Sequence, residues 1–384
     1  MKIDGKTSHN SPSLRFPEFN GEWVLNEMWN IAPLQRGFDL PSGNVLDGTI
    51  PVVYSNGILR YHNDYKCKAP AVITGRSGTI GKFTYLDKGY YWPHNTTLWV
   101  TDFCHNNPKF IYYLYQTINI SQFATGSGVP TLNRNDVHRH RCYLPKSIDE
   151  QRKIAAFLSL IDERIAIQDR LIDRLQSLMI GLNNSLYEQY GNDITTSFME
   201  LGYSYSGLSG KSAKDFGSGK PFITYLNVYS NIIVDETDYQ YVRINDGEKQ
   251  NIVRTGDVLF TLSSETPEEV GIGSVYLGEK EVYLNSFCFG IHIERNQLAY
   301  SPYLSYYVTS TAFRKFIYPF AQGSTRFNLC KADFEKASIK LPSLDNQKRI
   351  SAMLDCIAEK IQAEKAILEY YNIQRQYLLR QMFI

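Results

Sequence analysis

Two long segments of the chain carry apolar residues at the alternating four- and three-residue spacing of a heptad repeat. In the first segment the positions are Ile154, Leu158, Ile161, Ile165, Gln168, Ile172, Leu175, Met179, Leu182 and Leu186. In the second segment they are Ile350, Leu354, Ile357, Ile361, Glu364, Leu368, Tyr371, Arg375, Leu378 and Met382. This spacing predicts two amphipathic helices, at about 148–190 and 344–384, whose apolar seams pack in a coiled coil.

The direction of packing follows from a polar interruption that both seams share. Gln168 and Glu364 occupy equivalent positions, each close to the midpoint of its helix. Parallel packing would place the two globular parts side by side, whereas antiparallel packing creates a pseudo-two-fold and brings these polar residues together. A buried polar pair can fix helix register, so we expect an antiparallel coiled coil. The alternative is that each helix packs only on its own globular part. Asp149 and Asp345 are expected to supply the helix N-caps.

The segments before the two helices form an internal sequence repeat with a period of about 197 residues. The clearest matches are FATGS at 123–127 with FAQGS at 320–324, Leu-Pro at 144–145 and 341–342, and QRKI at 151–154 with QKRI at 347–350. The period is too long for a solenoid unit. It indicates a duplicated module in which a strand-rich globular part precedes a long helix.

This organisation predicts an α+β protein with two tandem mixed domains joined by the two helices. The expected segments are a disordered lead-in at 1–12, a first domain at 13–147, a first helix at 148–190, a second domain at 191–343 and a second helix at 344–384. Short β-like runs separated by Gly and Pro clusters, with 28 Tyr and 20 Phe, suit small strand-rich domains.

Composition narrows the class of protein. The net charge is +1, from 40 basic and 39 acidic residues, so any nucleic-acid contact must come from local patches or from a basic partner. The polar N-terminal segment has no apolar core of a secretory signal, and no apolar run is long enough to span a membrane. The six cysteines show no C-x-x-C spacing. They are expected to be free thiols in a reducing cytoplasm, and Cys356 is expected to be buried.

A glycine-rich basic loop at 75–82 is the first candidate for binding. It differs from a phosphate-binding P-loop because its first glycine is one residue too early and Phe83 replaces the required Ser or Thr. Free backbone amides beside basic side chains suit DNA phosphates or base edges. The alternative is a hairpin turn with solvated charges. The candidate DNA-binding residues here are Arg76, Ser77, Thr79 and Lys82.

The repeated Gly-Ser loops are the second candidate. Segments 126–134 and 323–331 share Gly-Ser, Asn and Leu, which indicates one backbone shape, and Arg326 has the chemistry to read a guanine edge. The alternative is a turn leading into the last strand. The candidate DNA-binding residues are Ser127, Thr131, Asn133, Arg134, Ser324, Arg326, Asn328 and Lys331. The basic run at 138–141 is expected to be a solvated edge.

Catalytic and metal-binding motifs are missing from the sequence. It has no Gly-x-Ser-x-Gly and no His-Glu-x-x-His, and its seven histidines form no metal-like set. Asn107-Pro108-Lys109-Phe110 differs from the Asn-Pro-Pro-aromatic motif of adenine methyltransferases by a lysine, and no methyl-donor loop accompanies it. We therefore expect a non-enzymatic chain without a metal.

The combined pattern resembles the specificity subunit of type I restriction–modification enzymes. The resemblance rests on two variable domains that each end in a Gly-Ser loop and Leu-Pro, and on the Gln-basic-basic-Ile heptad helices that follow. The opening LRFPEF at 14–19 with Trp23, and the closing QMF at 381–383, also look like that family. It covers essentially the whole chain, and the helix motifs are its specific part.

The resemblance implies a mode of action. Each domain would read one half of a split double-stranded DNA target, and the helices would dock two methyltransferase subunits and, through them, restriction subunits. S-adenosylmethionine, ATP and magnesium would be bound by those partners and not by this chain. Rigid separation predicts half-sites about 10 base pairs apart, and dissimilar domains predict an asymmetric target. The main alternative is a coiled-coil scaffold that binds only proteins.

The second domain departs from the first at the glycine-rich loop. Segment 261–269 is acidic where the first domain carries Arg76 and Lys82. Glutamate can accept a hydrogen bond from cytosine N4, but it repels phosphate. The candidate residues of the second domain are therefore restricted to its Gly-Ser loop.

Overall fold

The structure is a computed structural model that describes residues 10–126 and 128–384. The chain divides into two compact units: unit 1 comprises Met1–Asp169 and Ala366–Ile384, and unit 2 comprises Arg170–Lys365. The expected lead-in at 1–12 falls mostly outside the described residues. Within them, the N–H of Trp23 donates to the carbonyl of Asn10 (2.9 Å), so the end of this segment is hydrogen-bonded to the first domain.

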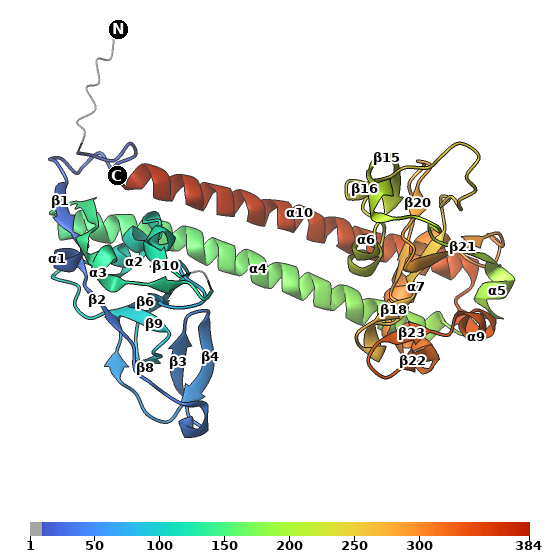
Figure 1. The fold of residues 1–384 in the computed structure, drawn as a ribbon, viewed down its shortest axis with the longest axis horizontal. Coiled ribbons are helices and arrows are strands. Elements are labelled where there is room, and N and C mark those ends of the chain that lie inside the picture. Colours follow the sequence, from blue (N-terminus) through green and yellow to red (C-terminus); the bar gives the residue numbers. More distant parts are fainter. Residues whose placement is uncertain (1–9, 127) are drawn as a thin grey trace, which may run out of the picture. The chain divides into compact units, whose positions relative to one another are not determined.

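The globular part of unit 1 combines strands with short helices (Figure 1). Its elements are β1 (Val24–Glu27), α1 (Met28–Ile31), β2 (Leu34–Arg36), β3 (Ile50–Tyr54), β4 (Gly57–His62), β5 (Cys67–Lys68), β6 (Ala71–Gly75), β7 (Phe83–Leu86), β8 (Tyr90–Pro93), β9 (Thr97–Val100), α2 (Pro108–Thr117), β10 (Ala124–Thr125), β11 (Thr131–Leu132), α3 (Arg134–Arg139) and β12 (Arg141–Leu144). The long helix α4 (Ile148–Tyr190) follows.

Unit 2 repeats this plan with additions. Its elements are β13 (Ile194–Thr196), α5 (Phe198–Leu201), β14 (Gly202–Ser206), β15 (Phe216–Ile223), α6 (Tyr225–Ser230), β16 (Tyr239–Val242), β17 (Val258–Thr261), β18 (Ser263–Ser264), β19 (Gly273–Val275), β20 (Tyr283–Leu284), β21 (Cys288–Ile293), α7 (Ser301–Thr309), α8 (Thr311–Ile317), β22 (Ala321–Gly323), β23 (Phe327–Leu329), α9 (Lys331–Lys336) and β24 (Ile339–Leu341). The second long helix, α10 (Leu344–Met382), follows.

Equivalent sheets form in both repeats. The order β2-β9-β6-β7 in unit 1 matches β14-β21-β17-β19 in unit 2, and β4-β3-β8-β5 matches β16-β15-β20. The central strands β6 and β17 are buried along their whole length, as expected for apolar runs that are covered on both faces. In unit 1, β3 and β4 lie at the end away from α4 (Figure 1).

Each globular part is closed by pairing its first strand with its last. Strand β1 pairs antiparallel with β12, which places Val24 opposite Leu144. In the second repeat β13 pairs with β24, which places Ile194 opposite Leu341. The chain therefore enters and leaves each globular part at neighbouring points.

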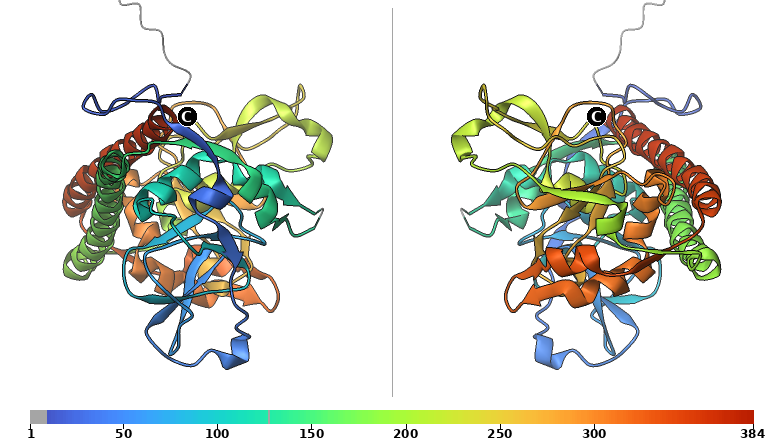
Figure 2. Two further views of the ribbon diagram at one scale, coloured as in Figure 1. Left: turned by 90° about the vertical axis from the view of Figure 1, so that its left-hand side faces the viewer. Right: turned by 90° about the vertical axis from the view of Figure 1, so that its right-hand side faces the viewer.

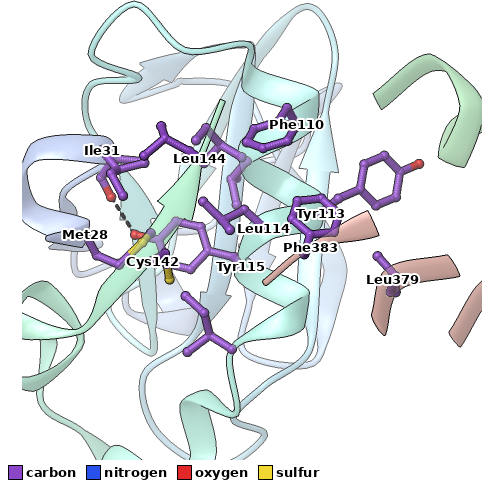
Figure 3. Packing of buried hydrophobic residues seen from close by; sticks show 14 of the residues in the cluster. Met28, Ile31, Phe110, Tyr113, Leu114, Tyr115, Cys142, Leu144, Leu379 and Phe383 are labelled. Carbon is purple, nitrogen blue, oxygen red and sulfur yellow. Dashed lines mark hydrogen bonds between the residues drawn. The ribbon is translucent and has the colours of Figure 1, made fainter. Parts of the chain in front are cut away.

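The end of the chain contributes to the core of unit 1. The ring of Phe383 lies 5.3 Å from that of Phe110 and 6.3 Å from that of Trp23, and Figure 3 shows it beside Tyr113. The buried Tyr115 donates its hydroxyl proton to the carbonyl of Ala32. In unit 1 the last turns of α10 lie beside the first turns of α4 (Figures 1 and 2).

A buried glutamine fixes the start of each long helix. Gln151 accepts from the N–H of Asn107 (2.9 Å), at the start of α2, and donates to the carbonyl of Pro145 (3.1 Å). Gln347 accepts from the N–H of Tyr300 (2.8 Å), at the start of α7, and donates to the carbonyl of Pro342 (2.9 Å). The repeated Leu-Pro and Gln of the sequence thus belong to one hydrogen-bonded junction.

The long helices begin slightly earlier than the expected caps. Ser147 precedes α4 and its hydroxyl accepts from the N–H of Glu150 (3.3 Å). Asp149 and Asp345 lie in the first turns, so their assignment as N-caps was wrong. They still lie where the helix dipole favours a negative charge. Cys356 is exposed, so its expected burial was also wrong.

The predicted seam is buried over most of its length. In α4 the side chains of Ile154, Leu158, Ile161, Gln168 and Ile172 are buried, and Ile165 and Leu175 are half-buried. In α10 those of Ile350, Leu354, Ile361 and Glu364 are buried, and Ile357 and Leu368 are half-buried. Gln168 belongs to unit 1 and Glu364 to unit 2, and their pairing stays a prediction.

Arg375 interrupts the apolar seam of α10, and contacts within unit 1 explain why a charged residue is accepted there. Its Nε donates to Asp162 of α4 (2.5 Å), and its Nη2 donates to the side-chain oxygen of Gln116 of α2 (2.6 Å). Asp162 also accepts from the hydroxyl of Tyr113 (2.7 Å). An arginine at a seam position is tolerated because one carboxylate and one amide oxygen accept its hydrogen bonds.

Candidate nucleic-acid interface

The glycine-rich loop of the first repeat follows the buried strand β6. The N–H groups of Arg76 and Ser77 donate to the carbonyl of Thr96 (2.7 and 3.2 Å), in the turn between β8 and β9. Gly75 begins the loop, and a Cβ at this position would lie 1.7 Å from the carbonyl oxygen of Thr79. Gly78 has φ +79, a conformation that favours glycine. The loop is therefore closed tightly on itself.

The loop is hydrogen-bonded to the Gly-Ser hairpin formed by β10 and β11. The N–H of Leu132 donates to the carbonyl of Arg76 (2.7 Å), and Ser77 and Thr131 form an antiparallel bridge. The N–H of Gly78 donates to the carbonyl of Pro130 (3.3 Å). The structure thus joins the two candidate clusters of the first repeat, and their contact with DNA stays a prediction.

The candidate side chains of the first repeat differ in their exposure to solvent. Arg76, Ser77 and Thr131 are half-buried, whereas Thr79, Lys82, Asn133 and Arg134 are exposed. The Lys82 ammonium donates to the carbonyl of Asn56 (2.8 Å) in the turn between β3 and β4.

Beyond the hairpin, two neighbouring candidates have different local roles. Asn133 caps α3 by accepting from the N–H of Asn135 (3.0 Å). Among the described residues Arg134 has no acidic partner, so it is the most available cation of the group. Ser127 lies outside the described residues.

The second repeat builds the same arrangement from different side chains. The N–H of Leu329 in β23 donates to the carbonyl of Leu262 (2.8 Å), and β18 pairs Ser263 with Asn328. The N–H of Leu262 in turn donates to the carbonyl of Phe287 (2.9 Å). These bonds repeat those of Leu132, Arg76 and Thr96, so the backbone of the candidate site is conserved between the two halves of the chain.

The candidate side chains of the second repeat also differ in their exposure to solvent. Ser324, Arg326 and Asn328 are exposed. Lys331 is half-buried, pairs with Glu335 (3.6 Å) and lies over the ring of Phe289 (4.9 Å). Arg134 and Lys331 match in sequence but differ in structure, since only Lys331 has an acidic partner within the described residues.

One acidic residue of segment 261–269, Glu269, is hydrogen-bonded within unit 2. Glu269 accepts from the hydroxyl of Ser264 (3.0 Å). Hydrogen bonds from Tyr229 and Ser264 lower the pKa of the Glu269 carboxyl. The carboxylate therefore stays ionised beside the hairpin and adds negative charge that the first repeat lacks.

The sequence did not reveal the turn between β8 and β9, whose Thr96 carbonyl accepts from the N–H groups of Arg76 and Ser77 in the glycine-rich loop. In this turn the ring of His94 stacks near that of Tyr54 (4.3 Å), and its Nδ1 lies 3.0 Å from the hydroxyl of Thr96. Burial lowers the pKa of His94. Its counterpart in unit 2 is the turn at 285–287. No local motif marks either turn, because strand pairing alone brings them to the site.

The basic run at 138–141 is only partly the solvated edge that was expected. The Nε2 of His138 accepts from the N–H of Leu34 (2.9 Å), and burial lowers the pKa of this histidine. Arg139 is exposed and pairs with Asp136. His138 is therefore a structural residue, and the expectation was wrong for it.

The described part of the chain comprises residues 10–126 and 128–384. No group of three or more His, Cys, Asp or Glu side chains in these ranges is arranged to hold a metal ion. No helix within the same ranges has the length and apolarity needed to cross a bilayer.

Solved structures share the fold across nearly the whole chain. The S subunit of a type I restriction–modification system from M. genitalium superposes with a TM-score of 0.59 at 16% identity, over 97% of this chain and 99% of that chain. A chain from a structure concerned with complex assembly and conformational transition of a type I restriction–modification system gives a TM-score of 0.57 at 16% identity. That match covers 93% of this chain and 96% of the other. At these identities the similarity establishes the fold.

Sequence relatives share shorter segments. The StySPI type I restriction enzyme specificity subunit of Salmonella potsdam is 27% identical over 150 residues, 39% of this chain and 32% of that protein. A putative type I specificity subunit of Mycoplasma pneumoniae is 26% identical over 182 residues, 44% of this chain and 46% of that protein. The matches thus span between about a third and about a half of these relatives.

The family assignment rests on both repeats. The sequence pattern of the type I restriction modification DNA specificity domain matches residues 25–177 and again residues 208–370. Each match contains most of one globular part and most of the long helix that follows. The chain therefore belongs to the type I restriction–modification DNA specificity family, as a protein with two tandem target recognition domains.

Proposed function

We propose that the chain reads a bipartite, asymmetric double-stranded DNA target, with one half-site for each repeat. The observation that carries this proposal is the repeated site, in which one set of backbone hydrogen bonds joins a hairpin, a loop and a turn in both units. The side chains on this shared backbone differ between the repeats. A common frame with different donors and acceptors suits recognition of two different half-sites.

The long helices are proposed to act as a ruler, packed as an antiparallel coiled coil with a pseudo-two-fold. In unit 1, Arg375 near the end of α10 binds Asp162 in the first half of α4. In unit 2, Met179 near the end of α4 and Ile361 in the first half of α10 line one pocket. Both observations support opposite helix directions. Half-sites about 10 base pairs apart are the expected consequence.

The helices are also proposed to dock two methyltransferase subunits, and restriction subunits through them. Their outer faces carry apolar side chains that the seam does not use, among them Leu160, Ile167 and Tyr370, which are 56%, 58% and 70% exposed. Exposed apolar patches indicate protein contacts. In this proposal the partners bind S-adenosylmethionine, ATP and magnesium, and the chain itself is non-catalytic, binds no cofactor and acts in the cytoplasm.

Single-molecule methylation sequencing tests the proposal directly. Cells would carry this chain with, and without, the methyltransferase gene of its system. A new split adenine-methylation motif that requires both proteins is the expected result. A continuous palindromic motif would contradict the bipartite reading. No new motif, with the methyltransferase expressed and bound to the chain, would favour a coiled-coil scaffold without DNA specificity.

Arg134→Gln tests whether the exposed first turn of α3 contacts the DNA backbone. A phosphate contact supplies affinity without sequence preference, so the variant should bind all sequences several-fold more weakly. The slope of log affinity against log salt concentration should fall by about 1. Lys88→Gln is the matched control. This lysine is also exposed, but it follows β7 and therefore lies at the end of that strand opposite the 75–82 loop. An unchanged salt slope for the Arg134 variant would place this residue outside the interface.

A further inference from the structure

The hydrogen bonds of the two repeats confirm the alignment of the Gly-Ser hairpins and identify one further pair of equivalent positions, Thr96 and Phe287, that the sequence alone does not align. The carbonyl of Thr96 accepts from the N–H of Arg76 in the first repeat, and that of Phe287 accepts from the N–H of Leu262 in the second. Within the hairpins, Leu132 matches Leu329 by the same criterion. Counting back three residues makes Val129 the counterpart of Arg326. The positions held by Thr96 and Val129 are therefore held by Phe287 and Arg326 in unit 2.

Phe287 is displayed to solvent by a rigid turn. Its side chain is 56% exposed although aromatic side chains are usually buried. The backbone around it is fixed, because its N–H donates to the side chain of Asn285 (2.9 Å) and its carbonyl accepts from Leu262 (2.9 Å). The N–H of Cys288 also donates to the carbonyl of Asn285 (3.0 Å). The exposed ring thus comes from a constrained backbone.

Arg326 is oriented beside this ring. Its guanidinium carbon lies 5.9 Å from the centre of the Phe287 ring, and its Nη2 donates to the hydroxyl of Ser263 (3.3 Å). Ser263 is itself held, because β18 pairs it with Asn328 and its carbonyl accepts from the hydroxyl of Tyr225 (2.8 Å). Within the described residues, the remaining N–H groups of the guanidinium have no protein acceptor. They are available to a ligand.

The two side chains offer complementary contacts to neighbouring base pairs. An arginine presents paired donors that match O6 and N7 of guanine in the major groove, and an apolar ring suits the 5-methyl group of thymine. A guanidinium that is already oriented loses less entropy on binding. At the equivalent positions the first repeat offers the hydroxyl and methyl groups of Thr96 and the isopropyl group of Val129, none of which can pair with both O6 and N7 of guanine.

We propose that Phe287 and Arg326 form a specificity-determining pair of the second repeat, in which Arg326 reads a guanine and Phe287 contacts the methyl group of an adjacent thymine. This inference rests on the proposed DNA-reading function and assigns residues to one half-site. It predicts that the half-site read by unit 2 contains a guanine next to a thymine. The half-site read by unit 1 gains no guanine preference from the corresponding positions.

The test compares methylation motifs of the wild-type chain, Arg326→Val and Phe287→Ser, each expressed with the methyltransferase of the system. In Arg326→Val the preference for guanine at one position of one half-site should fall by about 10- to 100-fold. In Phe287→Ser, which carries no methyl group or ring for the contact, the neighbouring thymine should become degenerate. The other half-site should be unchanged in both variants. Arg295→Val is the matched control, because this exposed arginine follows the opposite end of β21.

A binding measurement separates the methyl contact from general loss of folding. The complex of this chain with its methyltransferase is titrated with the mapped target and with the same duplex carrying uracil in place of that thymine. Wild type should bind the uracil duplex more weakly, and Phe287→Ser should bind both equally. Equal binding of both duplexes by wild type, or an unchanged motif in both variants, would overturn the inference. A wild-type complex that methylates no split motif would instead refute the proposed function.

Discussion

Replacing Asp257 with alanine is expected to destabilise unit 2 by about 3–5 kcal/mol. Asp257 is 2% exposed and accepts from the hydroxyl of Tyr205 (2.7 Å) and the N–H of Arg254 (2.8 Å). Nδ1 of His292 lies 2.7 Å from its other oxygen. Alanine would leave these buried groups without their acceptor, which costs more than the bonds themselves contribute. Urea unfolding of the purified chain measures the change.

Two further variants control this experiment. Asp257→Asn keeps one acceptor oxygen of similar size, so it should lose less stability than the alanine variant. Asp246→Ala removes an exposed carboxylate of the same unit and should change stability by less than about 0.5 kcal/mol. Equal stability of the Asp257→Ala chain and wild type would show that the buried cluster does not hold the sheet together. Burial raises the pKa of Asp257, so all measurements should share one pH.

Gly75→Ala is expected to abolish recognition of the first half-site and to weaken specific DNA binding by more than about 10-fold, or about 1.4 kcal/mol. The added Cβ would lie 1.7 Å from the carbonyl oxygen of Thr79, which is backbone and must therefore move. That movement displaces the loop from the hairpin carrying Thr131. Fluorescence titration of target duplex with the chain and its methyltransferase measures the loss.

Gly43→Ala is the matched control for this substitution. A Cβ at Gly43 would meet no atom within 4 Å, so the variant should bind DNA as wild type does. Unfolding measurements on both variants establish that unit 1 remains folded. Full affinity in a folded Gly75→Ala chain would show that the loop does not contribute to the DNA interface.

The long helices and the repeat were predictable because their signals are local and redundant. A heptad repeat places an apolar residue in nearly every turn of the helix. This repeated signal predicted helices close to the observed Ile148–Tyr190 and Leu344–Met382. The cap of α4 lies two residues before Asp149, because the hydroxyl of Ser147 accepts from the N–H of Glu150. The Arg375 departure could not be explained from the sequence, since its partner Asp162 lies more than two hundred residues away.

The candidate site was predictable only in part. Repetition of the Gly-Ser loops marked a shared backbone, and the structure joins Ser77 to Thr131. It did not reveal the turns that carry Thr96 and Phe287, because strand pairing decides which turns meet at the end of β6 or β17. The burial of His138 was not predicted from the sequence either, because its contact with Leu34 depends on how α3 packs.

The pairing of β1 with β12, and of β13 with β24, bears on how such a protein can diversify. Entry and exit of each globular part lie side by side, with Val24 opposite Leu144 and Ile194 opposite Leu341. Strands between these points that do not contact the long helices can be replaced while the two attachment points keep their separation. The residues that pack against the helices, such as Phe110 and Asn107, would have to be kept. Under the proposed function, recombination at these borders would therefore change the target sequence while leaving the helices and their partner contacts unaltered.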